Sequence, residues 1–195
     1  MVSCDRDAAG QVLPDLLDSR DIERDAQTAL MRFLSWVFAQ EMAEEATPRL
    51  SIILGQENRN SLPPFPFIVV TPLMSERLAT NERRYHADGA ETILQETRIS
   101  FQVDFYGECA LRRMTRFSTL FRDEIGCQWF VQDGCDIHPL YAENRRQLPF
   151  VSDSQQWVDR WTISASLQLD QKIKINTGSA ITVGDVGIVC VDRSA

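Results

Sequence analysis

The chain has 195 residues and a mass of 22.2 kDa, a length that favours one domain with at most a small appendage. Its 44% apolar and 25% charged residues are ordinary for a globular protein and exclude the collagen-like, disordered and membrane classes. With 20 basic and 28 acidic residues the net charge is −8, so the surface as a whole repels nucleic-acid phosphates and anionic lipid. A high-affinity DNA-binding protein is therefore not expected.

The sequence shows no membrane span and no export signal. The longest uncharged run, residues 60–75, contains four prolines and is shorter than the roughly 18–20 apolar residues that a membrane helix needs. Charged residues at positions 5–7 occupy the place of the apolar stretch of a signal peptide. Five cysteines without a Cys-x-x-Cys pair are typical of reduced thiols in a cytoplasm, with a Cys127–Cys135 disulfide as a minor alternative.

The N-terminal part of the chain predicts a polar segment, a helix and a short strand. Residues 1–19 are expected to form a loosely held arm, because they are mostly polar and include Gly10 and Pro14. Apolar residues then recur with a period of 3.6 over residues 21–45, which indicates an amphipathic helix. A short apolar run at 51–54 predicts a strand.

A connector, a second strand and a charged segment follow. Residues 56–66 contain three prolines and are expected to form a stiff, extended connector. Residues 67–71 are β-branched or aromatic and predict a buried strand that Pro72 ends. Residues 75–92 carry seven charged side chains and indicate a long hairpin or a solvated loop.

The middle of the chain shows the clearest strand and a second helix. Apolar residues from Ile99 to Phe105 alternate with polar ones, the period of a strand with one buried face. Residues 108–125 predict a helix that Gly126 terminates, and Cys109 is interpreted as a small core residue at its beginning. Residues 128–132 are expected to form another strand.

The C-terminal part predicts one more long strand. Residues 136–154 show no clear pattern, and Pro139 and Pro149 argue against regular structure throughout the segment. From Trp157 to Leu169 the residues again alternate, which predicts a long amphipathic strand. The β-prone, glycine-interrupted tail after Gln171 suggests a short hairpin or an arm that orders against a neighbour.

These elements predict an α+β fold: an antiparallel or mixed sheet with two main helices packed on one face. The expected domain organisation is an N-terminal arm at 1–19, an α+β domain at 20–170, and a C-terminal arm or short hairpin at 171–195.

Motifs for catalysis or cofactor binding are not found. His86 and His138 lie far apart in polar contexts, and neither has another Cys or His ligand within four residues, so no metal site is predicted. The sequence has no glycine-rich phosphate loop, nucleophile elbow or His-Glu-x-x-His motif. Cys109 is the one candidate nucleophile, since it precedes a predicted helix. We therefore expect neither an enzyme nor a cofactor.

Several segments taken in order nevertheless resemble one known family. The segments are 55–59, the Pro63-Pro64 spacer, 68–73, 77–81 with Tyr85, 102–107 and 157–161. They are similar to the neck or tail-terminator family of tailed, chiefly contractile-tailed, bacteriophages, and the similarity covers roughly residues 20–170.

The resemblance implies a structural virion protein of the tail or neck, made in the bacterial cytoplasm. Six copies would form a ring at the head-proximal end of the tail, ending tube and sheath growth and joining the tail to the head connector. Genomic DNA would pass through the lumen without specific binding. No membrane, catalytic residue, cofactor or metal is implied.

Long polar segments that a monomer does not need suggest where such subunits meet. The expected subunit or partner interface consists of Asn58, Arg59, Pro63, Pro64, Arg77, Asn81 and Tyr85. The lumen is predicted to be net acidic or neutral, since arginine clusters there would hold DNA phosphate. Arg112, Arg113 and Arg116 are expected to be solvated or paired with acidic residues of a neighbour.

Two alternatives belong to other classes of protein. One is a different virion part, such as a connector adaptor, a tail-completion protein or a baseplate subunit. The other is a small cytoplasmic enzyme that uses Cys109 or a site assembled between subunits.

Overall fold

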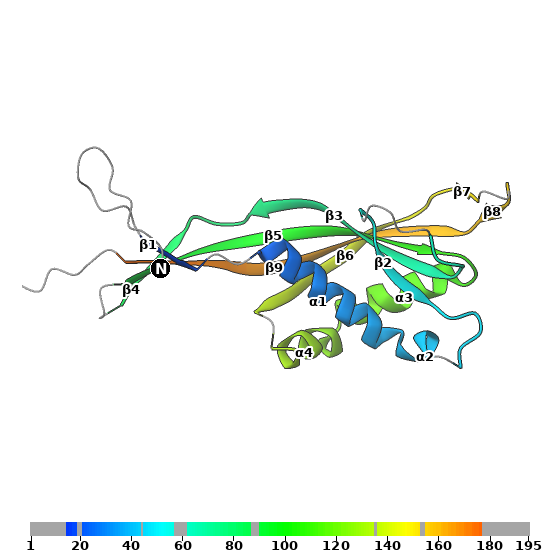
Figure 1. The fold of residues 1–195 in the computed structure, drawn as a ribbon, viewed down its shortest axis with the longest axis horizontal. Coiled ribbons are helices and arrows are strands. Elements are labelled where there is room, and N and C mark those ends of the chain that lie inside the picture. Colours follow the sequence, from blue (N-terminus) through cyan, green and yellow to red (C-terminus); the bar gives the residue numbers. More distant parts are fainter. Residues whose placement is uncertain are drawn as a thin grey trace, which may run out of the picture.

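In the described part of the chain, the main element is a seven-stranded mixed β-sheet with helices on one face (Figure 1). The computed structural model describes residues 15–18, 21–43, 45–56, 62–86, 90–134, 136–152 and 155–176. None of the helices in these ranges is long and apolar enough to cross a membrane. The α+β class predicted from the sequence is confirmed.

The described helices are one long helix, one single turn and two further helices in succession. They are α1 (Ile22–Val37), α2 (Ala39–Met42), α3 (Ala110–Phe121) and α4 (Glu124–Gln132). The strands of the main sheet are β1 (Asp15–Asp18), β2 (Ser51–Leu54), β3 (Phe67–Arg77), β4 (Glu82–Tyr85), β5 (Ala90–Tyr106), β6 (Ile137–Gln147) and β9 (Arg160–Asn176). A separate two-stranded ribbon pairs β7 (Phe150–Val151) with β8 (Trp157–Val158).

Two long antiparallel strands, β5 and β9, form the spine of the sheet. They stay in register over their full length, from Ala90 opposite Asn176 to Tyr106 opposite Arg160. β3 and then β4 follow the other edge of β5, and β6 and β1 follow the other edge of β9. β2 pairs with the start of β3 in parallel, which makes the sheet mixed.

The hydrophobic core lies between one face of the sheet and the helices. The alternating residues Ile99 to Phe105 of β5 point into it, as do those of β9 from Ile163 to Leu169. α1 contributes Phe33, and α3 contributes Phe117 and Phe121, all fully buried. The helices therefore form because their apolar stripes have a sheet face to cover.

The strand expected at 128–132 is wrong, because this segment belongs to α4. Trp129 to Val131 are β-prone residues, but Gly126 and Phe130 are buried four positions apart, which is helical spacing. The side chain of Asp123 caps the new helix by accepting from the Ile125 amide. Gly126 does not terminate α3, which ends at Phe121; a Cβ at Gly126 would lie 2.2 Å from the Leu120 carbonyl oxygen.

Pro72 and Pro139 lie inside strands, although the sequence predicts that Pro72 ends a strand and that Pro139 argues against regular structure. Residues 137–147 form β6, with Pro139 inside it, and β3 continues through Pro72 to Arg77. β6 is an edge strand, and β3 beyond Val70 has no neighbour on its outer side among the described strands. A proline at such an edge removes no necessary ladder hydrogen bond, and the pairing register shifts next to both residues.

The remaining predicted segments correspond to the structure with small differences. The helix expected at 21–45 is divided at Phe38 into α1 and α2. β9 continues through residue 170 to Asn176, and β1, inside the segment expected as the N-terminal arm, pairs with the last residues of β9. Residues 1–14 and 177–195 lie outside the described residues.

Candidate functional site

The sheet extends well beyond the helices that cover it (Figure 1). The far halves of β5 and β9 project together, with β4 on one side and β1 on the other. We call this region the arm: β1, β4, residues 90–96 of β5 and residues 170–176 of β9. The helix-covered remainder of the sheet with α1–α4 is the body. A projection of this kind adds little to a core and is available for contact with other molecules.

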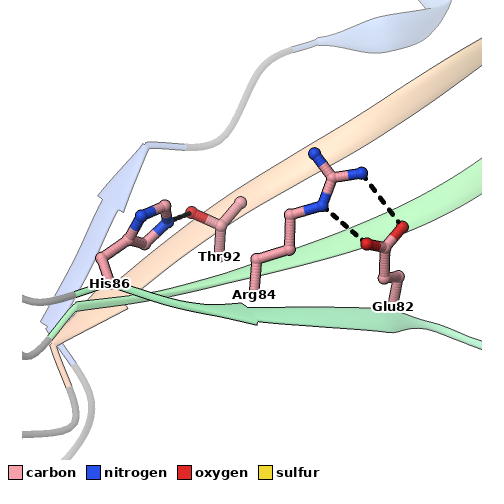
Figure 2. Close-up of polar contacts among 4 residues, drawn as sticks. All are labelled: Glu82, Arg84, His86 and Thr92. Carbon is pink, nitrogen blue, oxygen red and sulfur yellow. Dashed lines mark hydrogen bonds and ion pairs between the residues drawn. The ribbon is translucent and has the colours of Figure 1, made fainter.

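Charged side chains of β4 form ion pairs within the arm. Figure 2 shows Arg84 and Glu82 in a bidentate ion pair, with Nε–Oε1 at 2.6 Å and Nη2–Oε2 at 3.3 Å. His86 Nε2 lies 2.8 Å from Thr92 Oγ1 across the β4–β5 hairpin (Figure 2). The hydrogen bond from Arg84 lowers the pKa of Glu82 below its ordinary value. The arm surface is thus ordered by local polar contacts.

A second ion pair and an exposed aromatic side chain complete this hairpin. Arg83 Nη1 donates to Glu91 Oε1 at 3.0 Å, and this hydrogen bond raises the pKa of Arg83. The Glu91 side chain is almost fully buried, whereas 74% of Tyr85 is exposed. An exposed tyrosine on a rigid strand supplies contact area at small entropic cost, as interface aromatics do.

The structure brings only part of the predicted interface together. Arg77 at the end of β3 donates from Nε to the Ala79 carbonyl at 2.7 Å and from Nη2 to Asn81 Oδ1 at 2.8 Å. This contact holds the link between β3 and β4, next to the arm that carries Tyr85.

The two described prolines of the predicted interface lie elsewhere. Pro63 and Pro64 precede β3, whereas Arg77 is its last residue. Ten residue steps of strand separate Phe67 from Arg77, about 33 Å. The predicted residues therefore divide into two groups at opposite ends of one strand, and Asn58 and Arg59 lie outside the described residues.

An aromatic row marks the end of the molecule opposite the arm. The rings of Phe65, Phe67, Tyr106 and Phe150 follow one another with centroid distances of 5.1, 4.6 and 5.2 Å. Burial is the main cause that raises the pKa of Tyr106. Beyond this row the β7–β8 ribbon projects, and Trp157 on it is 76% exposed.

Trp157 is a surface residue that lies outside the long strand. The sequence predicts one amphipathic strand from Trp157 to Leu169, but β8 ends at Val158 and β9 begins at Arg160. Trp161 packs against the core, whereas Trp157 does not. Asp159, which breaks the strand between the two tryptophans, is the one sequence signal that could have separated them.

The arginines of α3 have two different environments. Arg113 is buried, and its guanidinium donates to Glu41 Oε2 at 2.6 Å and to the Glu108 carbonyl at 2.5 Å. Its partner is thus in the same chain, not in a neighbour. Arg112 is exposed, and Arg116 reaches Glu41 only at 3.6 Å.

Groups suited to catalysis do not converge in the described part of the chain. Cys109 is exposed with φ of 62°, so its interpretation as a core residue is wrong. His86 lies on the arm and His138 on the exposed edge strand β6. Among the described residues, no three His, Cys, Asp or Glu side chains gather as metal ligands would.

Comparison with known proteins gives one match. A family model described as phage neck terminator protein matches residues 24–192, which include the body and most of the arm. No curated protein matches the chain.

Proposed function

The chain belongs to the phage neck terminator protein family, and from this we propose that six copies form a ring at the head-proximal end of a phage tail. The ring ends growth of the tail tube and of a contractile sheath, and it joins the tail to the connector below the head. The family is a structural one, which supports a role in binding and not in catalysis.

The observation that carries this proposal, besides the family, is that the subunit has two unlike ends. The arm with Tyr85 projects at one end, and the ribbon with Trp157 projects at the other (Figure 1). A cyclic ring needs two different, complementary patches on each subunit, in contrast to the self-complementary patch of a twofold dimer. A subunit with distinct surfaces at its two ends meets that requirement.

A free strand edge offers a further contact. Beyond Val70 the outer side of β3 has no neighbouring strand in the described part of the chain. Leu73 and Met74 on this stretch are 51% and 55% exposed. Unpaired strand edges with apolar side chains are the usual template for adding a strand from another chain. We assign this edge to a tail tube or sheath subunit or to a neighbour in the ring.

The net charge of −8 suits the passage of DNA. An acidic lumen repels DNA phosphates and a neutral one does not bind them, so the genome can pass through the ring. The arginines of α3 should therefore face away from the ring axis.

The test is to remove the protein from its phage and examine the particles by electron microscopy. We expect tails of irregular, excessive length that carry no heads, and we expect the wild-type neck to contain a six-fold ring of density for this chain. Tails of normal length would contradict the terminator role. Density at the baseplate, or between portal and neck, would identify a different virion part.

A further inference from the structure

The exposed face of α3 is strongly basic, although the whole chain is acidic. Its exposed charged residues are Arg112 and Arg116, the exposed Arg122 directly follows its last residue, and α3 contains no acidic residue. Arg145 of β6 adds a fourth guanidinium, because its Nη2 lies 2.5 Å from Ser118 Oγ on the same helix. We call these four residues the arginine face. At 1.5 Å per residue, Arg112 and Arg122 stand about 15 Å apart along the helix.

Most of this charge is not neutralised inside the subunit. Glu41 already pairs at 2.6 Å with the buried Arg113, and its other oxygen is 3.6 Å from Arg116. Arg112 and Arg122 make no ion pair with any described residue. Apolar side chains accompany the charges, since Leu111 on α3 and Ile125 at the start of α4 are 48% and 51% exposed. Arginine together with exposed aliphatic residues is the composition of protein interfaces.

A groove of about 750 Å³ with the opposite charge lies at the base of the arm. Its apolar side chains include Ile22, Ala29, Ile137 and Leu169, and its carboxylates are Asp21, Asp25, Asp136 and Asp170. Two cations also line it, but both have partners: Lys172 pairs with Asp136, and Arg32 Nη1 lies 3.3 Å from Asp133. None of the described residues that line it belongs to α3.

The groove also borders an unoccupied stretch of strand edge. On this side of β9, the pairing with β6 ends at Leu169 and the pairing with β1 begins at Lys174. Residues 170–173 therefore have no strand neighbour there among the described strands. Asp25 and Asp170 lie on either side of this opening, on α1 and β9.

We propose that the arginine face of one subunit docks on the groove of the next copy of this chain in the ring. The two surfaces match in kind, since each combines aliphatic side chains with charges of opposite sign. They also lie on different sides of the subunit: the N-terminal end of α1 faces the arm, whereas α3 lies toward the β7–β8 end (Figure 1). A contact between two different sides repeats in one direction and can close into a ring.

This inference rests on the proposed ring, and charge reversal can test the docking contact separately from the ring itself. In the full chain, Arg112→Glu with Arg122→Glu places like charges across the contact, whereas adding Asp25→Arg with Asp170→Arg restores opposite charges. The matched control is Arg49→Glu with Arg146→Glu, which changes the net charge equally. Among the described residues, Arg49 hydrogen-bonds the Met42 carbonyl and forms no ion pair. Arg146 is opposite Thr162 in the β6–β9 register, and Thr162 alternates with the core residue Ile163, so both lie on the helix-free face of the sheet.

Light scattering after gel filtration measures the mass, and circular dichroism verifies folding. If the free chain is monomeric, the same variants are scored for binding as rings to purified tails. We expect a six-fold mass for the wild type and the control, a single-subunit mass for the arginine reversal, and recovery in the four-site variant. The arginine reversal should weaken association at least about tenfold, because facing like charges oppose docking.

Each other outcome overturns one defined statement. Rings of the arginine-reversed variant as stable as those of the wild type would disprove the docking contact and leave the ring intact. Loss of DNA binding in that variant, with an unchanged ring, would assign the arginine face to nucleic acid. A wild-type chain that forms no ring either alone or on tails would disprove the proposed function itself.

Discussion

Strands β5 and β9 run through both the body and the arm, but different interactions stabilise the two regions. In the body, Phe33 of α1 contacts five aromatic rings at centroid distances of 5.2–6.1 Å, and all of its surface is buried. In the arm, local pairs such as Arg84–Glu82 and Arg83–Glu91 order a largely exposed hairpin. The body therefore supplies the stability of the fold, and the arm supplies a surface at little cost to it.

Truncating the centre of the body should produce the largest effect. Phe33→Ala leaves a cavity among Phe117, Phe121, Trp129 and Phe130, and should lower the free energy of unfolding by about 3–5 kcal/mol. Urea unfolding followed by circular dichroism measures this change. Phe33→Leu fills more of the space and should cost clearly less. A loss below about 1 kcal/mol for the alanine variant would mean that the helices do not depend on this cluster.

The buried ion pair under α3 should rank second. Arg113→Ala leaves Glu41 without its closest cation and the Glu108 carbonyl without its donor. Because Glu41 keeps some exposure, we expect a loss of about 1–3 kcal/mol. Arg112→Ala on the same helix is the matched control, and it should change stability by less than about 0.5 kcal/mol. Equal effects of the two variants would remove the distinction between the inner and outer arginines.

The body was more predictable from sequence than its periphery, for a physical reason. The alternation from Ile99 to Phe105 and the stripe of α1 each reflect one buried face, so the local pattern carries the information. α4 was not predicted because its few buried residues, Gly126 and Phe130, depend on where α3 ends. β6 was missed because tolerance of Pro139 depends on its place at the sheet edge, which no local pattern shows.

The candidate surfaces were predicted less completely, since they depend on contacts between distant segments. The contact between Arg77 and Asn81 is local, and both residues belong to the predicted interface, which stays a prediction. The arginine face keeps its charge because Glu41 pairs with Arg113, 72 residues further along the chain, and not with Arg112. The groove combines α1, the approach to β6 and the middle of β9, and such a combination needs the tertiary structure.

A pH titration should distinguish the aromatic end of the body from the rest. Burial raises the pKa of Tyr106 above its ordinary value of 10.0, so the folded state favours the neutral phenol more than the unfolded chain does. This contribution to stability is fully present below about pH 10 and is lost as the pH rises through the folded pKa. Absorbance at 295 nm should show a late phenol titration in the wild type.

The Tyr106→Phe variant serves as the control for that titration. It should lack the late step, and its alkaline loss of stability should be smaller than that of the wild type. A late titration that persists in the variant would assign the shift to another tyrosine and would leave Tyr106 accessible to water.

The arm pair in Figure 2 offers a smaller, local test. Arg84→Ala removes the hydrogen bond that lowers the pKa of Glu82, so the carboxyl should titrate closer to its ordinary 4.5. Since the folded pKa is depressed, the favourable effect is present above the unfolded pKa and fades as the pH falls through the folded one. Carboxyl-detected NMR follows Glu82 directly. An unchanged Glu82 midpoint would show that the pair does not persist in solution.

The smallest effect on stability should come from the most exposed aromatic residue of the arm. Tyr85→Ala removes a side chain that is 74% exposed, and the free energy of unfolding should change by less than about 0.5 kcal/mol. If the arm is a contact surface, the same variant should still weaken ring formation or tail attachment, measured by light scattering and by sedimentation with tails. Thr80→Ala, an exposed change at the base of the arm, is the control. A variant as stable and as well assembled as the wild type would exclude Tyr85 from the contact, and a large loss of stability would show that the arm is part of the folding unit after all.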